Sequence, residues 1–187
     1  MRRIFNFRMA FIVFISSITL PLVSGIGSKV YAQDRPETGH ITTVFVLRHA
    51  DRDKEGNLTE AGKYRAIDLV HVLGSSGIEA IYTTDFDRTK GTVQPLARCL
   101  GIHPEIYGRN LKEFVDKVMT THRGEPVLIV GHDSTLKPII EGLIGRKIER
   151  NIGDQFDDIH IVTIDPSGNG TVVSIKYGNR IGLNKCK

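Results

Sequence analysis

Two continuous apolar stretches that end at histidines constrain this chain more than any other feature. Residues 44–47 lead directly into Arg48 and His49, and residues 127–130 are followed, one residue later, by His132. Apolar runs of this kind, rich in β-branched residues and bounded by polar ones, are typical of strands buried on both faces. In open α/β sheets, ligands bind just beyond the carboxyl ends of such strands. We therefore expect both imidazoles to lie at a ligand site.

The first 32 residues have the layout of a secretory signal peptide. A basic start precedes an apolar stretch over 9–23, and Val30 and Ala32 place small residues at a cleavage site. The stretch is near the short end of the roughly 17–25 residues of a membrane span. We expect no membrane span after cleavage, with an uncleaved anchor as the alternative. The protein is then periplasmic or secreted, with 33–41 as a linker and 42–187 as one domain.

Removing the signal peptide changes the charge of the chain. The full sequence has 25 basic and 21 acidic residues, and its first 32 residues contain four of the basic ones and no acidic one. The remaining chain is formally neutral, which gives no support for nucleic-acid or membrane-surface binding. Cys99 and Cys186 are too widely separated for a metal motif. Outside the cytosol they either form one disulfide or remain two free thiols.

Strand and helix patterns alternate along the chain, which is typical of an α/β fold with a parallel-cored sheet covered on both faces. Predicted strands cover 42–48, 80–83 and 127–131, predicted helices cover 60–73, 88–100, 111–122 and 134–144, and 103–107 is a candidate edge strand. Alternating stretches at 159–164 and 171–177 flank a turn and predict a C-terminal β-hairpin, so the sheet is mixed.

The helix predicted over 60–73 has a candidate cap and a candidate buried face. Thr59 is of a residue type that caps helix N-termini. The apolar spacing in this helix predicts that its buried face is formed by Ala61, Ile67, Val70 and Leu73.

Arg48 and His49 carry the chemistry expected at the first strand end. A neutral imidazole can attack phosphorus and form a phosphorylated intermediate, which divides one difficult displacement into two easier ones. An adjacent arginine can hold phosphate oxygens through bidentate contacts. The pair predicts a phosphate site with a histidine nucleophile, although for the dipeptide alone a solvated surface pair is the more common interpretation.

Arg88, His132 and Asp133 extend this site along the sequence. Arg88 opens a predicted helix, where free backbone N–H groups favour anions, although it could instead pair with Asp85 or Asp87. His132 repeats the strand-end position and can bind phosphate or stabilise the transition state. Asp133 can protonate the leaving oxygen as a general acid or cap the next helix.

Other titratable residues are weaker candidates for chemistry. Further possible proton donors are Asp51, Asp85 and Glu105. The remaining histidines are expected to be structural or solvated: His40, His71, His103, His122 and His160. No histidine pair has tight metal-ligand spacing, and the glycines form no phosphate-binding loop motif. We therefore expect no metal and no cofactor.

Taken in order, these segments resemble the histidine phosphatase superfamily, which includes the phosphoglycerate mutases and the histidine acid phosphatases. Residues 47–51 are similar to the Arg-His-Gly block around the family's nucleophile, with Ala50 in place of the glycine. Residues 82–92 resemble its Ser-x-x-x-Arg-x-x-x-Thr block. Residues 130–133 resemble the block that contains the family's second histidine. Residues 58–62 resemble the Leu-Thr-x-x-Gly start of its first helix. The similarity extends over most of 42–177.

The resemblance implies the three-layer α/β/α fold of phosphoglycerate mutases and no metal. It implies that His49 is the nucleophile and that Arg48, Arg88 and His132 form the phosphate pocket, with Arg52 near the mouth as a possible substrate contact. The segment between Arg88 and His132 is too short for the inserted loop that carries an acidic residue in mutases, which favours hydrolysis. Asp133 resembles the acid of the acid phosphatase branch.

The resemblance implies a phosphomonoesterase that works through a phosphohistidine intermediate, and the signal-peptide layout of residues 1–32 predicts that it is exported. Its substrate is expected to be a small-molecule or cell-envelope phosphate ester, such as a sugar phosphate of the envelope, and not a nucleic acid. Two alternatives stay open at this point. One is a non-catalytic phosphate-binding or sensing module, and the other is a phosphohistidine protein phosphatase.

Overall fold

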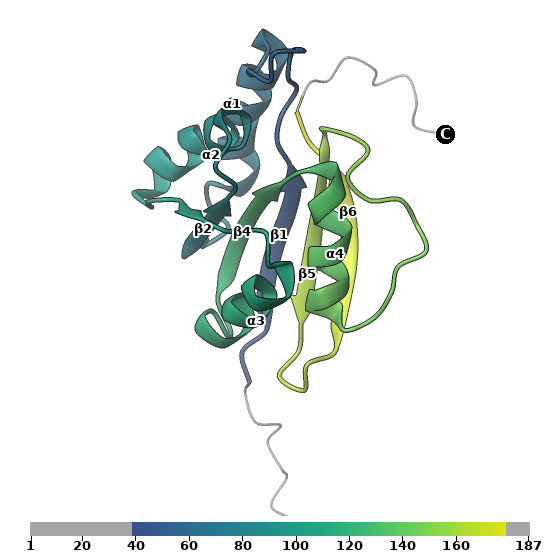
Figure 1. Ribbon diagram of the computed structural model, residues 1–187. Coiled ribbons are helices and arrows are strands. Elements are labelled where there is room, and N and C mark those ends of the chain that lie inside the picture. Colours follow the sequence, from purple (N-terminus) through teal and green to yellow (C-terminus); the bar gives the residue numbers. More distant parts are fainter. Residues whose placement is uncertain (1–38, 179–187) are drawn as a thin grey trace, which may run out of the picture. The chain divides into compact units, whose positions relative to one another are not determined.

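The computed structural model describes residues 39–178, which form a mixed β-sheet and the helices that cover it (Figure 1). The elements in chain order are β1 (Thr42–Arg48), α1 (Glu60–Leu73), β2 (Ala80–Thr83), α2 (Asp87–Leu100), β3 (Glu105–Ile106), α3 (Leu111–Thr121), β4 (Pro126–Gly131), α4 (Asp133–Ile144), β5 (Asp158–Ile164) and β6 (Gly170–Lys176). The predicted signal peptide, most of the predicted linker and Cys186 lie outside the described residues, so these predictions stay untested.

The strand order of the sheet is β3-β2-β4-β1-β5-β6. The four strands from β3 to β1 are parallel, and β5 and β6 pair antiparallel as the predicted C-terminal hairpin. In the register of β1 and β4, Arg48 lies opposite Gly131, and the N–H of His49 donates to the Gly131 carbonyl at 3.0 Å. This register brings His49 and His132 side by side at the carboxyl ends of neighbouring central strands.

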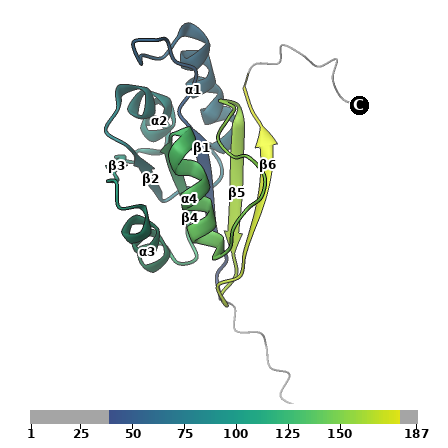
Figure 2. The same ribbon diagram turned by 45° about the vertical axis from the view of Figure 1, so that its right-hand side comes forward.

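Helices cover both faces of the sheet, which confirms the three-layer α/β/α fold. One apolar cluster joins the sheet to α3 and α4, with Phe114, Val118, Leu136 and Ile140 among its members. A second cluster, on the other face, joins the sheet to α1 and α2. Figures 1 and 2 show α4 crossing the first face beside α3, with α1 and α2 packed together on the other side. Every residue of β2 is buried.

The predicted buried face of α1 is confirmed at Leu73, which is buried, and at Val70, which packs against the second cluster, but it is wrong at two positions. Ala61 and Ile67 are exposed, and the residues that face the core are Gly62, Ala66, Leu69 and Leu73. The reason is a close approach of the helix to the loop after β1, because a Cβ at Gly62 would collide with the carbonyl oxygen of Asp51. Small residues are therefore buried at this contact. The predicted cap is confirmed, since the hydroxyl of Thr59 accepts from the Gly62 N–H at 3.1 Å.

The predicted helix boundaries agree with the structure to within one residue, and the edge strand is shorter than predicted, covering Glu105–Ile106. Within residues 39–178, no helix combines the length and apolar character needed to cross a membrane.

Candidate active site

The structure brings His49, the predicted nucleophile, together with the three predicted phosphate-pocket residues beyond the ends of β1 and β4. The ring centroids of His49 and His132 are 5.4 Å apart. Arg88, in the first turn of α2, places Nη2 3.3 Å from Nδ1 of His132. Arg48 ends β1 immediately before His49 and is within electrostatic range of both imidazoles. Residues separated by more than 80 positions in the sequence therefore share one site.

The protonation state of His49 follows from its burial and from one hydrogen bond. Its Nδ1 lies 2.8 Å from the carbonyl oxygen of Ala50, and because a carbonyl only accepts, Nδ1 carries the proton. Nε2 is therefore the nitrogen with the free lone pair. The residue is only 2% exposed, and burial, aided by the charges of Arg48 and Arg88, lowers its pKa to about 4. His49 is neutral at neutral pH, as a nucleophile requires.

His132 has the opposite tautomer, since its two nitrogens have different partners. Arg88 can only donate, so Nδ1 of His132 accepts from it, and Nε2 carries the proton. That proton is donated to Oγ1 of Thr84 at 2.8 Å. The Thr84 hydroxyl lies in turn 3.0 Å from that of Thr89, which bonds to backbone carbonyls. Burial and then the Arg88 charge lower the pKa of His132.

Arg48 is held by the loop between α4 and β5. Its Nη1 donates to the carbonyl oxygens of Gly153 at 3.2 Å and Asp154 at 3.1 Å. Its guanidinium carbon lies 4.3 Å from the ring centroid of Phe156, within the range of a cation–π contact. These contacts fix the guanidinium beside His49 without consuming all of its donors.

Both arginines of the site retain a buried donor. The Nε atoms of Arg48 and Arg88 are inaccessible to solvent and have no hydrogen-bond partner within residues 39–178. Buried N–H groups are nearly always paired, because leaving one unpaired costs free energy. The charges of both guanidiniums act on His49, and this positive environment favours an oxyanion at the site. His132 is also the N-cap of α4, so the site lies at a helix N-terminus, where anions are favoured.

Asp133 is the carboxyl group closest to this cluster. Its Oδ2 lies 3.4 Å from Nη2 of Arg48, and its Oδ1 accepts from the Ser134 N–H at 2.8 Å. The N-cap of α4 is His132, so Asp133 is the first helical residue and not the cap. Its side chain is 59% exposed, which leaves it accessible to substrate and water.

The other candidate proton donors form ion pairs elsewhere. Asp51 pairs with Arg65 at 2.6 Å in a partly buried position. Burial would raise its pKa, but the hydrogen bond and charge of Arg65 outweigh this, and the pKa of Asp51 is lowered. Asp85 pairs with Lys90 at 2.9 Å, and Glu105 pairs with Lys117 at 2.8 Å. Arg88 therefore bonds to His132 and is not the partner of the nearby aspartates.

Arg52 lies at the exposed rim of the cluster. Its Nη1 donates to the backbone oxygen of its neighbour Asp53, and its charge adds to burial in lowering the pKa of Arg88. This position is consistent with the predicted location at the pocket mouth, and contact with substrate stays a prediction. Within the described part of the chain, no group of three or more His, Cys, Asp or Glu side chains is arranged to hold a metal ion.

Two aromatic rings beside the imidazoles, and the hydrogen-bonded pair Thr84 and Thr89, were not identified from the sequence. The Phe156 ring lies 5.6 Å from that of His49, and the Phe86 ring lies 5.0 Å from that of His132 and 4.3 Å from the Arg88 guanidinium carbon. Thr84 and Thr89 fall within the block 82–92, so their position in that block was an available signal. Phe156 follows no sequence pattern, because only the folded loop brings it to the site.

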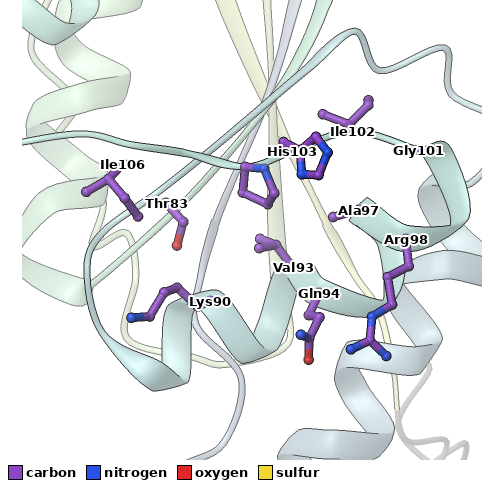
Figure 3. A pocket seen from close by; sticks show the side chains of 11 residues that line it. Thr83, Lys90, Val93, Gln94, Ala97, Arg98, Gly101, Ile102, His103 and Ile106 are labelled. Atoms are coloured by element: carbon purple, nitrogen blue, oxygen red, sulfur yellow. The ribbon is translucent and has the colours of Figure 1, made fainter.

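A separate cavity of about 460 Å³ lies between α2 and the segment 101–106 (Figure 3). Val93 and Ala97 of α2 line it together with Ile102 and Ile106, and Lys90 and Arg98 are also part of its wall. Neither His49 nor any of the three phosphate-pocket residues contributes to it. This cavity is distinct from the site described above.

Comparisons with known proteins give matches to solved structures alone. No family model matches the sequence, and no curated protein does. The protein histidine phosphatase SixA complexed with tungstate has 21% sequence identity and a TM-score of 0.61, over 72% of this chain and 96% of that chain. A putative α-ribazole-5'-P phosphatase from Escherichia coli has 15% identity and a TM-score of 0.59, over 74% and 97%. A phosphoglycerate mutase from Plasmodium falciparum has 16% sequence identity and a TM-score of 0.52, over 73% of this chain and 91% of that chain.

The chain therefore has the fold of the histidine phosphatase and phosphoglycerate mutase-like proteins, and the predicted resemblance is confirmed at the level of the fold. At these identities, the activity of the chain must be inferred from its own site.

Proposed function

We propose that this protein is a phosphatase that hydrolyses phosphomonoesters through a phosphohistidine intermediate on His49. The observation that carries the proposal is the placement of a neutral, buried His49 beside His132 and the guanidiniums of Arg48 and Arg88. A nucleophile with a free Nε2 lone pair and a cationic oxyanion pocket are the two requirements for attack on a phosphoryl group. The phosphatases among the structures of the same fold support this interpretation.

The first step is attack of His49 Nε2 on phosphorus, which forms the N–P bond as the P–O bond to the leaving group breaks. Arg48 and Arg88 stabilise the negative charge of the transferred phosphoryl oxygens. The protonated carboxyl group of Asp133 donates its proton to the leaving oxygen. The product alcohol then departs, and His49 holds the phosphoryl group.

The second step is attack of water on the phosphohistidine. The Asp133 carboxylate takes a proton from the water, the N–P bond breaks, and phosphate leaves as His49 recovers its neutral form. The exposure of Asp133 allows water to reach this carboxylate. His132, as a neutral imidazole with Nδ1 toward Arg88, orients that guanidinium on the phosphoryl group.

Export to the periplasm or the medium is part of the proposal. Its support is the basic, then apolar, then small-residue order of residues 1–32. The measurement is the N-terminal sequence of the protein recovered from the extracellular or periplasmic fraction. A start at Gln33 is expected, and a protein that begins at Met1 in the cytosol would contradict export.

A second candidate is hydrolysis of phosphohistidine on a protein. The structural similarity to the protein histidine phosphatase SixA favours it. In this case the leaving group is the imidazole of a partner protein and not an alcohol. Dephosphorylation of a phosphohistidine-containing protein faster than any small phosphate ester would select this candidate.

The test of the proposed function is release of inorganic phosphate from phenyl phosphate by the protein that begins at Gln33. The wild type is expected to turn over and His49→Ala to lose turnover by at least about a thousandfold, as for other covalent nucleophiles. His71→Ala, on the exposed side of α1, is the matched control. A wild type that binds phosphate but turns over no ester would instead identify a sensing module.

A further inference from the structure

An apolar cavity of about 320 Å³ adjoins the phosphate pocket at His132. Phe86, Tyr107 and Leu111 form its apolar wall. The rest of the lining includes Thr84, His132, Thr135 and the exposed, charged Asp85 and Arg109. Cavities of this size lined by apolar side chains with a few polar groups are typical of small-molecule sites.

The cavity is continuous with the phosphate pocket on one side. His132, Phe86 and Thr84 border both, whereas His49 does not line the cavity. In phosphoryl transfer, the attacking and leaving atoms are roughly in line with phosphorus between them. The leaving group therefore departs away from His49, and the cavity lies on the side of the pocket that His132 borders.

The two threonine hydroxyls of the cavity wall are already engaged. The Thr84 hydroxyl is bonded to His132 and Thr89, and the Thr135 hydroxyl accepts from the His132 N–H at 2.9 Å. A hydroxyl-rich leaving group would give up its bonds to water here and find these hydroxyls occupied, which is unfavourable. A sugar is therefore a poor occupant of this cavity.

Two residues of the apolar wall are aromatic, the buried Tyr107 and the partly exposed Phe86. Tyr107 is buried and stacked on Phe114, with centroids 4.3 Å apart and an angle of 11° between the rings. Phe86 meets His132 edge-on, at an angle of 87°. A flat ring can pack between such surfaces with little loss of conformational freedom.

We propose that this cavity, lined by Phe86, Tyr107 and Leu111, is the leaving-group subsite of the phosphatase and selects monoesters of planar, apolar alcohols. This inference rests on the proposed function and names the substrate class of that same site. It differs from the sugar phosphate of the cell envelope that the sequence suggests, because the cavity has an apolar wall and its threonine hydroxyls are already engaged.

The experiment compares kcat/KM for benzyl phosphate and ethyl phosphate, whose leaving groups are both primary alcohols. In the wild type, benzyl phosphate is expected to be preferred by at least about tenfold, the discrimination that an apolar pocket gives for added apolar groups. Leu111→Asn keeps the size of the side chain but makes it polar, and it is expected to lower this preference about tenfold.

The matched control is Ile106→Asn. Ile106 is 53% exposed and lines the separate cavity of Figure 3, not the proposed subsite. This variant is expected to leave the benzyl-to-ethyl ratio unchanged. A loss of preference in Ile106→Asn alone would overturn the proposal and assign the leaving group to the other cavity.

Inhibition keeps the proposal testable if Leu111→Asn does not fold. Benzylphosphonate is expected to inhibit the wild type at least about tenfold more strongly than ethylphosphonate. Equal turnover of the two esters, with equal inhibition by the two phosphonates, would overturn the subsite and leave the phosphatase assignment intact. Absence of turnover on both esters, with no phosphate on His49, would overturn the proposed function itself.

Discussion

The hydroxyl of Thr84 lies 2.8 Å from Nε2 of His132 and fixes the tautomer of that imidazole. Because Nε2 donates to Thr84, Nδ1 presents its lone pair to Arg88. The hydroxyl of Thr89, a buried residue in the first turn of α2, lies 3.0 Å from that of Thr84 and completes the arrangement. His132 is thus oriented by residues that themselves have no contact with a bound phosphate in the proposed mechanism.

Thr84 is therefore a positioning residue, and Thr84→Val is expected to lower kcat. The valine has nearly the same shape but leaves Nε2–H without its acceptor, a loss of about 1–3 kcal/mol that corresponds to about tenfold to a hundredfold in rate. Thr84→Ser restores the acceptor and is expected to recover kcat. The measurement is steady-state kinetics with kcat and KM separated. Equal kcat for Thr84→Val and Thr84→Ser would contradict this role.

His49 is expected to titrate near pH 4 in the folded protein. Burial lowers its pKa from the ordinary 6.5 to about 4, so the nucleophile stays neutral well below neutral pH. The measurement is an NMR titration of the His49 ring resonances, assigned through their loss in His49→Asn. A midpoint near 6.5 would show that the ring is solvated and not buried as described.

The same pKa difference has a consequence for stability. The folded pKa lies below the unfolded one, so neutral His49 favours the folded state above about pH 6.5, and this contribution declines as the pH falls from 6.5 to about 4. The free energy of unfolding, measured in urea, is expected to decrease through this window. His49→Asn removes the group and should make the decrease smaller, whereas an unchanged pH dependence would contradict the assignment.

Replacement by asparagine is expected to affect mainly kcat at Asp133 and mainly the free energy of unfolding at Asp51. Asp133→Asn removes the general acid and should lower kcat for ethyl phosphate by about a hundredfold to ten-thousandfold. Asp51→Asn breaks the contact with Arg65, so it should lower the free energy of unfolding by about 1–3 kcal/mol and have a smaller effect on kcat. Parallel urea unfolding and kinetics distinguish the two, and a larger kinetic effect at Asp51 would identify it as the acid.

Much of the fold could be predicted from the sequence because its signals are local. Apolar runs predicted the central strands, and turn residues predicted the hairpin of β5 and β6. The burial of Gly62 and Ala66 in α1 was missed because hydrophobicity was weighted above size. The spacing of Gly62, Ala66, Leu69 and Leu73 matches a helical face once small residues are counted as contact residues.

The residues of the candidate site also fall into those that local sequence patterns predict and those that only the folded structure reveals. His49 and His132 were predicted as neighbours because both follow central strands, and strand ends are local features. The stacking of Phe156 on Arg48 joins residues more than 100 positions apart. No periodicity encodes such a contact, since it depends on how the loop after α4 returns to the sheet. The hydrogen bond from the His132 N–H to the Thr135 hydroxyl also cannot be predicted without side-chain geometry.

The most direct measurement is the detection of phosphate on His49 during turnover. The protein is mixed with phenyl phosphate, quenched in alkali, digested, and analysed by mass spectrometry for an acid-labile phosphate. We expect a phosphopeptide containing His49 in the wild type, more of it in Asp133→Asn if the second step is slowed more than the first, and none in His49→Ala. Undiminished turnover in His49→Ala, or phosphate located on another residue, would contradict the mechanism.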